Sequence, residues 1–305
     1  MKAENGTLYK IINILVFAAG LVIFLMSYGI WQIFTGSGQE NGGIAQLFDR
    51  PGLSPGRCIL LLVPAVVLVH FIKGLRLYLA VYGLNISKFM HTELYLRVTP
   101  ISVILPFKLG EFFRMYCYGA ELGSMLKGIV IILLDRFMDT AALVTVLLLF
   151  CLQSGGLLSG VAYVLIIFLV FMISAYFVFP GLHSFWKKYL LQAAATENKL
   201  RMLKLLEAVE AVYREITLVT RGRGALLYFL SLLAWGAEIG SFAIVYGKGE
   251  ENIGGSISEY LSGALGGSMS EELSRFVFIS VVVLLALKLL TGLYSQARKN
   301  CEMKK

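Results

Sequence analysis

Long apolar runs alternate with shorter polar stretches along the whole chain. A run of about 18 or more apolar residues is long enough to cross a bilayer as a helix. Six runs reach this length, at about residues 11–34, 58–84, 125–152, 160–179, 225–246 and 273–293. The pattern predicts an all-α polytopic membrane protein with about six transmembrane helices, forming one integral-membrane domain over residues 1–305.

Residues 85–123, between the second and third runs, have a different pattern. They contain two short apolar pieces, His91–Leu105 and Glu111–Gly119, on either side of Pro106. As helices these pieces would be about 22 Å and about 14 Å long, too short to cross a hydrocarbon core about 30 Å thick. We therefore expect a re-entrant helical hairpin that enters the membrane, turns near Pro106 and returns to the same side.

The distribution of positive charge supports this topology. Lys and Arg are concentrated near the N-terminus, in residues 182–223 and in the C-terminal tail, whereas the other loops contain few. Cytoplasmic loops of membrane proteins are enriched in Lys and Arg, so both termini are expected in the cytoplasm. That assignment requires residues 85–123 to begin and end inside, as a hairpin does. The net charge of +8 then reflects topology and does not indicate a nucleic-acid partner.

Residues 182–223 are expected to form a cytoplasmic segment, because Pro180 and Gly181 should end the preceding span. Apolar residues recur within the segment every three or four positions, at Leu205, Val209, Val212, Ile216 and Val219. This spacing predicts an amphipathic helix. The helix would lie on the anionic inner leaflet or pack under the transmembrane bundle.

The composition excludes several classes of protein. Hydrophobic residues make up 58% and charged residues only 15%, against about 45–50% and about 25% in soluble domains. The four cysteines and three histidines show no spacing typical of a disulfide framework or a zinc site. Neither a Walker loop nor a dinucleotide-binding fingerprint is present. The sequence thus predicts no cofactor, no metal and no soluble catalytic domain.

A first cluster of charged residues follows Pro106 and comprises Lys108, Glu111 and Arg114, with Gly110 between them. The second arm of the hairpin would begin near Gly110, so its free N–H groups would point into the membrane. Lys108 and Arg114 flank this helix start, which predicts an anion site whose natural ligand is a lipid phosphate. The alternative is an interfacial loop whose long side chains reach the water.

A second cluster, Asp135, Arg136 and Asp139, lies in the third apolar run. Asp135 is expected near the bilayer middle, where three unpaired charges would together cost about 8–10 kcal/mol. The charges must therefore be paired or hydrated. Arg114 with Asp139 and Arg136 with Glu111 are natural pairings, and the sequence does not choose between arrangements. The plainer interpretation is that the Asp–Arg pairs only fix helix packing.

Other polar residues receive separate interpretations. Lys73 and Arg76 are expected at the interfacial end of the second span, and the aromatic residues Tyr78, Tyr82 and Tyr95 beside the same interface. Glu238 is a single acid in the fifth run, where a structural hydrogen bond and a proton-linked role are equally consistent with the sequence.

At these clusters the sequence resembles the transmembrane region of lysylphosphatidylglycerol synthases, the MprF-type or UPF0104 flippase-like family. The resemblance rests on Gly110, Glu111 and Arg114, on Arg136 and Asp139, and on the step from Trp235 to Glu238. Pro106 stands one residue further from Gly110 than in the family pattern. A second broken segment at about 261–272 matches through Gly266, Gly267 and Glu272, but lacks the family's proline and third glycine.

The resemblance implies a flippase-like protein of the bacterial plasma membrane that moves an anionic or aminoacylated phospholipid, or a lipid-linked sugar, between leaflets. The implied substrate-binding residues are Lys108, Gly110, Glu111, Arg114, Asp135, Arg136, Asp139 and Glu238. Two alternatives remain. The chain could be the membrane component of a lipid-modifying transferase that works with a separate synthase subunit, although it shows no aminoacyl-transferase domain of its own. It could also be a scaffold that binds a partner and uses these charges only for structure.

Overall fold

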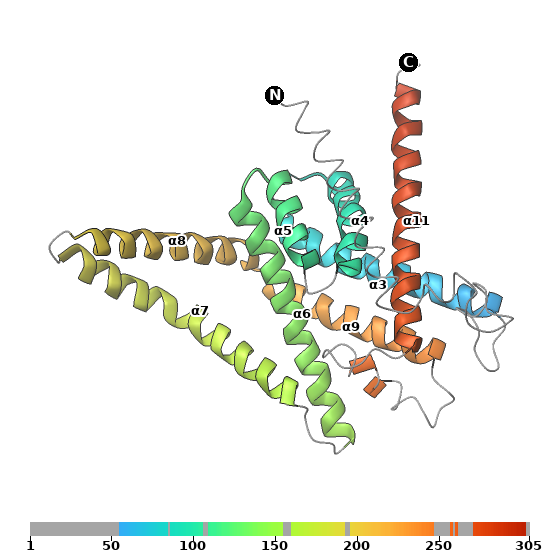
Figure 1. Cartoon of the computed structure of the whole chain (residues 1–305), viewed down its shortest axis with the longest axis horizontal. Helices are drawn as coiled ribbons and strands as arrows, with labels where there is room; N and C mark the ends of the chain where they lie inside the picture. The colour runs from blue at the N-terminus through green and yellow to red at the C-terminus, as the bar shows by residue number, and fades with distance from the viewer. Residues whose placement is uncertain are drawn as a thin grey trace.

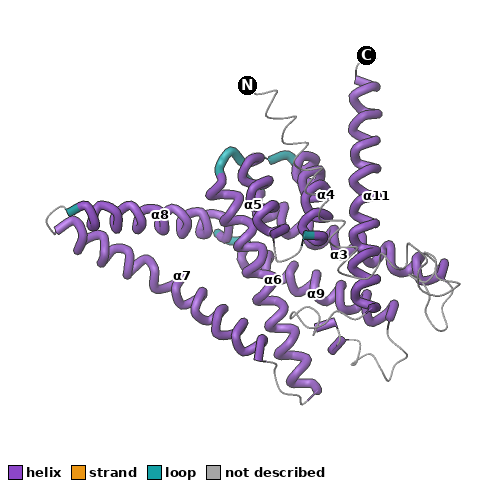
Figure 2. The backbone as a smooth tube through the Cα atoms, viewed as in Figure 1, coloured by secondary structure: helices purple, strands orange, loops and turns teal. Residues whose placement is uncertain are grey.

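The computed structural model describes residues 55–84, 86–105, 109–154, 160–192, 196–246, 257–258, 260–261 and 271–302. Within these ranges the chain is helical and contains no strand (Figure 2). The helices are α3 (Pro55–Val81), α4 (Lys88–Ile104), α5 (Leu109–Glu121), α6 (Met125–Ser154), α7 (Gly160–Gln192), α8 (Glu197–Thr220), α9 (Gly224–Tyr246) and α11 (Glu271–Glu302) (Figure 1).

The body of the molecule is built around α3 and α9, which lie side by side (Figure 1). Helix α6 crosses both of them, and α5 packs along α6. Helix α4 packs between α5 and α11, and α11 also contacts α3. Helices α7 and α8 extend away from this body as an arm. The charged residues of α3, α5 and α6 therefore meet where these helices cross.

Among the residues that the structure describes, four helices are long and apolar enough to cross a membrane, with candidate spans at Leu60–Val81, Gly160–Gln192, Gly224–Ile244 and Phe276–Leu293. They correspond to four of the predicted runs, which confirms the all-α membrane class. Helix α6 covers the run predicted at about 125–152. The first run, residues 11–34, lies outside the described residues, so the total of six remains a prediction.

Helices α4 and α5 are the two predicted arms of the hairpin, and they pack against each other on either side of residues 106–108. Helix α4 begins after Ser87, whose hydroxyl accepts a hydrogen bond from the Met90 N–H at 3.2 Å. A Cβ atom at Gly110 would lie 2.3 Å from the backbone oxygen of Ser102. Only glycine fits this approach between the arms, so Gly110 has a packing role.

One boundary prediction was wrong. Pro180 lies inside α7, which continues to Gln192 instead of ending at the proline. A proline within a membrane helix removes one hydrogen bond, a loss that local adjustment of the helix tolerates. Helix α11 extends to Glu302, and its candidate membrane span ends at Leu293, as predicted. The predicted second broken segment, about 261–272, lies mostly outside the described residues.

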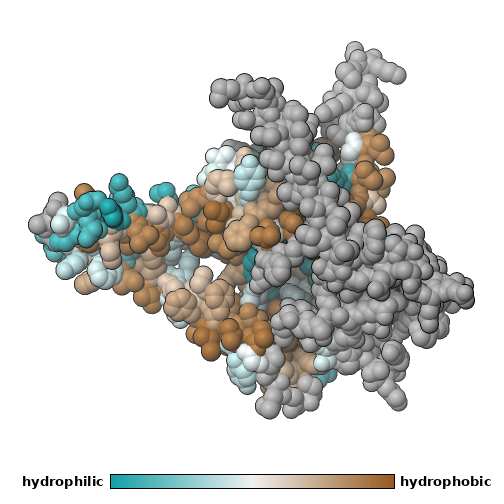
Figure 3. Space-filling view, in the orientation of Figure 1, coloured by the Kyte–Doolittle hydropathy of each residue, from teal (hydrophilic) through white to brown (hydrophobic). Residues whose placement is uncertain are grey.

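The predicted amphipathic helix in residues 182–223 is α8, and its surface changes along its length. Val219 is buried against the body, whereas Leu205 and Val209 remain exposed on the arm. Hydrophilic side chains gather at the tip of the arm, and hydrophobic ones dominate nearer the body (Figure 3). The tip includes the exposed ion pair between Arg201 and Glu197.

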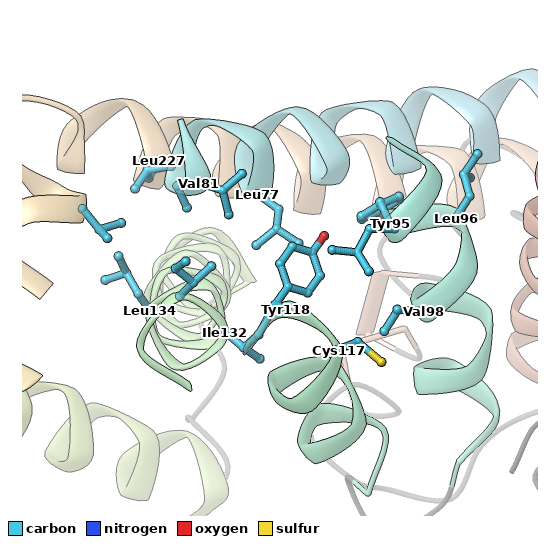
Figure 4. Close-up of a cluster of buried hydrophobic side chains, with 14 of the residues drawn as sticks. Leu77, Val81, Tyr95, Leu96, Val98, Cys117, Tyr118, Ile132, Leu134 and Leu227 are labelled. Carbon is cyan, nitrogen blue, oxygen red and sulfur yellow. The ribbon is translucent and has the colours of Figure 1, made fainter. Parts of the chain in front are cut away.

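The core beside the charged residues is a cluster of buried side chains from α3, α4, α5, α6, α8, α9 and α11. Figure 4 shows Tyr118 extending from α5 toward Leu77 on α3, with Ile132 of α6 beside it. Glycines let α5 and α6 approach closely, because a Cβ at Gly128 would lie 2.3 Å from the Gly119 nitrogen. This close contact brings α5 and the charged face of α6 together.

Candidate functional site

Asp135 on α6 lies at the centre of the charged network and is only 4% exposed. Its carboxylate is shared by three arginines from three helices. Arg76 on α3 donates from Nε at 2.8 Å, and Arg136 donates from its Nη2 at 2.9 Å. The Nη2 of Arg114 on α5 lies at the longer distance of 3.5 Å. A carboxylate accepts up to about four hydrogen bonds, so one aspartate satisfies donors from all three sides.

Arg76 was not predicted to belong to the site. The expectation that it lies at an interfacial helix end is wrong, because it is only 2% exposed. Its guanidinium pairs with Asp135 and Asp139, and also donates to the Ser231 hydroxyl on α9 at 2.8 Å. The planar fork of arginine suits this bridging between two carboxylates. Asp135 and Asp139 do share one helix face, as their spacing predicted, and that face meets Arg76.

The structure also decides the pairing that the sequence left open. Arg136 Nε lies 3.5 Å from a Glu111 oxygen, which confirms that pairing. Arg114 pairs with Glu111 at 3.3 Å and with Asp135, so the suggested pairing of Arg114 with Asp139 is wrong. Asp139 instead pairs with Arg76 and, at 3.3 Å, with Arg136. The rotation of α5 against α6 directs Arg114 to the aspartate one turn before Asp139.

The network contains equal numbers of arginines and carboxylates, and its charges sum to zero. Its members are Arg76, Arg114, Arg136, Glu111, Asp135 and Asp139. A balanced set is what a membrane interior requires, because an uncompensated buried charge costs several kcal/mol. Mutual pairing therefore accounts for the presence of six charges at this depth.

Exposure increases from one side of the network to the other. The side chains of Arg76 and Asp135 are 2% exposed, whereas Arg136 is 39% exposed. Glu111 lies beside Arg136 at this open side. The Arg136 Nε group makes no hydrogen bond within the described part of the chain. The open side thus presents a partly exposed guanidinium next to a carboxylate.

A second ion pair lies one helical turn away along α3. Lys73 pairs with Glu238 on α9, so the interpretation of Glu238 as a single acid is wrong. The Tyr260 hydroxyl also donates to Glu238. A cavity of about 80 Å³ borders the pair and is lined in part by His70. Space of this size holds a few water molecules.

His70, Lys73 and Arg76 are spaced three residues apart and form one polar stripe on α3. The spacing itself was the signal that could have identified them, since residues at i and i+3 share a helix face. Tyr95, which was expected at the interface, is also buried. Its hydroxyl oxygen lies 3.2 Å from the Nδ1 atom of His70. Interior polar residues of α3 were thus mistaken for interfacial ones.

The predicted site residues separate into three groups. Glu111, Arg114, Asp135, Arg136 and Asp139 meet in one network, and Glu238 belongs to the neighbouring pair. Gly110 forms the close contact between α4 and α5, and Lys108 lies outside the described residues. Trp235, part of the family resemblance, donates from its indole N–H to the Asp139 backbone oxygen at 3.1 Å. Whether any of them binds substrate remains a prediction.

The residues described offer no group of three or more His, Cys, Asp or Glu side chains arranged to hold a metal ion. The carboxylates that lie closest together are occupied by arginine. Pairs of arginine and carboxylate suit the binding of phosphate and ammonium groups instead.

Comparison with known proteins agrees with this geometry. Residues 52–247 match the family model described as the lysylphosphatidylglycerol synthase transmembrane region. The matched range includes α3 to α9 and with them the whole charged network. Neither a curated protein nor a solved structure matches the chain significantly.

Proposed function

This chain belongs to the lysylphosphatidylglycerol synthase transmembrane-region family, and we propose that it moves a lipid with a charged headgroup between the two leaflets of its membrane. Family membership supports a membrane protein with a flippase-like, lipid-related role. The substrate class that we propose is a phospholipid that is anionic or aminoacylated, of the lysyl-phosphatidylglycerol type.

The charge-balanced network with one open side is the observation that carries this proposal. A headgroup cannot cross hydrocarbon with its charges unpaired, because each costs about 2.5–3.5 kcal/mol or more there. In a network of paired charges, a residue can release its partner within the protein and bind a headgroup charge of the same sign in its place. Each charge of the headgroup is then paired during the crossing.

Each part of the network suits one part of such a headgroup. A phosphate would enter beside Arg136 and displace Glu111 from it, and Arg114 would add a second guanidinium. The released Glu111 carboxylate would then face an ammonium group of an aminoacyl headgroup. Glu238 on α9 offers a second carboxylate, which lies further along α3 and is already paired with a cation, Lys73.

The more exposed position of Arg136 makes it the natural first contact for the phosphate. Arginine binds phosphate with two parallel hydrogen bonds, which lysine cannot reproduce. The buried pairs around Arg76 and Asp135 would hold the helices in place while the open side exchanges partners. In this arrangement Arg136 and Glu111 bind substrate, and Arg76 positions α3 against α6.

The experiment is lipid translocation in proteoliposomes that contain only the purified protein. Fluorescent phosphatidylglycerol, its lysyl form and a polyprenyl-phosphate sugar are each tested for access to an external quencher. Arg136→Gln should slow translocation of the transported lipid roughly tenfold, because it removes a charge-assisted hydrogen bond. The matched control is Arg201→Gln, which removes an exposed arginine at the tip of the arm.

The outcomes separate the alternatives. Transport of one lipid that Arg136→Gln reduces and Arg201→Gln leaves intact would support the proposal and identify the substrate. Folded protein that moves none of the three lipids would refute it. The transferase-component and scaffold alternatives would then be tested by searching for a partner protein.

A further inference from the structure

A groove with a volume of about 620 Å³ lies between α3, α4 and α11. Its walls follow one face of each helix. The lining residues of α3 are Val67, His70, Phe71, Gly74, Leu75 and Tyr78. Those of α4 are Lys88, His91, Thr92, Tyr95 and Leu96, and those of α11 are Leu287 and Thr291. Ligand-binding cavities typically measure about 300–1,000 Å³, so this groove has room for a small molecule.

The groove presents a mostly carbon surface, because four of its polar side chains are bonded within the protein. Thr92 donates to the Lys88 backbone oxygen at 3.0 Å, and Thr291 donates to the Lys288 backbone oxygen at 2.9 Å. The Nε2 atom of His91 lies 3.1 Å from the Gly74 oxygen, and His70 is bonded to Tyr95. The walls are thus suited to a hydrocarbon ligand.

One charged group lies at the end of the groove. Lys88 is exposed on the first turn of α4 and forms no ion pair within the described ranges. Helices α3 and α4 run antiparallel here, since Tyr78 packs against His91 and His70 contacts Tyr95. Lys88 therefore lies beyond Tyr78, at the opposite end from Val67. The groove has a cationic end and an apolar end.

The dimensions match one leaflet of a bilayer. From Val67 to Tyr78 the groove follows α3 for about 16 Å, and half of a hydrocarbon core is about 15 Å thick. Phe71 and Leu75 on its wall are exposed apolar residues within the candidate span Leu60–Val81. The groove is therefore open to lipid from the side.

We propose that the α3/α4/α11 groove binds one acyl chain of a membrane phospholipid and that Lys88 binds the phosphate of the same lipid. This assignment rests on the proposed lipid-moving function and describes the substrate as it enters the protein, before its phosphate moves to Arg136. His70 connects the two parts of the site, because it lines both this groove and the small cavity beside Lys73 and Glu238. The acyl chain would then lie on one side of His70, and the Lys73–Glu238 pair on the other.

The test uses phosphatidylglycerol with a photoreactive diazirine in its acyl chain, incorporated into proteoliposomes with the full-length protein. After illumination, labelled peptides are mapped by mass spectrometry. We expect labelling to concentrate on the groove faces of α3, α4 and α11. Labelling spread evenly over the exposed apolar helices, α7 included, would overturn the proposal.

Variants test the two ends separately. Gly74→Leu should fill the groove and reduce its labelling roughly tenfold, since a ligand and a side chain cannot share the space. Gly74→Ala is the matched control, because its Cβ would make only ordinary contacts, 3.7 Å from the Tyr95 ring. Thr92→Phe fills the groove from its exposed rim and serves if Gly74→Leu fails to fold.

Unlabelled phosphatidylglycerol should compete with the diazirine lipid for labelling of the groove. Lys88→Gln should weaken this competition roughly tenfold, whereas Lys88→Arg should retain it. Equal competition in both variants would show that Lys88 is not part of the binding site.

The two proposals fail in different ways. Groove labelling without translocation would leave a lipid-binding groove and refute the transport function. Translocation that continues in Gly74→Leu, with no groove labelling in the unmodified protein, would refute the groove and leave the transport function standing.

Discussion

Arg76 on α3 and Asp135 on α6 form a buried ion pair between positions 59 residues apart in the chain. The Nε and Nη2 atoms of Arg76 lie 2.8 Å and 2.6 Å from the same carboxylate oxygen. Because Arg114 and Arg136 share the second oxygen, this one pair connects α3 to both α5 and α6. The relative positions of three helices thus depend on a single buried carboxylate.

Asp135→Asn is expected to destabilise the protein by about 3–5 kcal/mol, because it leaves buried arginines without their shared counter-charge. Thermal unfolding in detergent, followed by loss of the monodisperse peak in size-exclusion chromatography, measures the effect. Glu197→Gln is the matched control, since Glu197 forms only an exposed pair with Arg201. Equal unfolding temperatures for the two variants would contradict the central role of Asp135.

Arg76→Lys is expected to behave as a loss of function despite keeping the charge. A single ammonium group cannot reach Asp135, Asp139 and the Ser231 hydroxyl together, as the guanidinium does. Unfolding temperature and lipid translocation should both decrease. Ser231→Ala removes only one of these partners and should cost about 1 kcal/mol. If Arg76→Lys matched the unmodified protein in both assays, the bridging geometry would be unimportant.

Gly110→Ala should destabilise the hairpin by about 1–3 kcal/mol, because the added methyl group overlaps the Ser102 backbone. Gly236→Ala on α9 is the contrasting substitution, since its Cβ meets no atom within 4 Å. Alanine there should be neutral or slightly stabilising. Unfolding measurements on both variants test the close contact, and a harmless Gly110→Ala would argue against it.

The Lys73–Glu238 pair should appear as a coupling energy in a double-mutant cycle. Lys73→Met and Glu238→Gln each leave one partner of the pair without its counterpart, so each alone is destabilising. Together they should cost less than the sum of the two, by about 0.5–3 kcal/mol. Additive effects would show that the pair contributes nothing beyond its separate members.

The sequence by itself predicted the membrane class, most helix positions and the two arms of the hairpin. Those features follow from the length and period of apolar runs, which local geometry and the bilayer thickness impose. It also identified five members of the charged network, because unpaired charges inside an apolar run are costly and must find partners. These residues are Glu111, Arg114, Asp135, Arg136 and Asp139.

Only the tertiary structure decided how these charges are paired. Pairing depends on the rotation and crossing of α3, α5, α6 and α9, which no local pattern encodes. Lys73 and Arg76 illustrate this, because the same residues suit an interfacial helix end or a buried stripe, depending on what packs against α3. The packing of α6 and α9 onto that face buries Arg76 against Asp135 and places Lys73 beside Glu238.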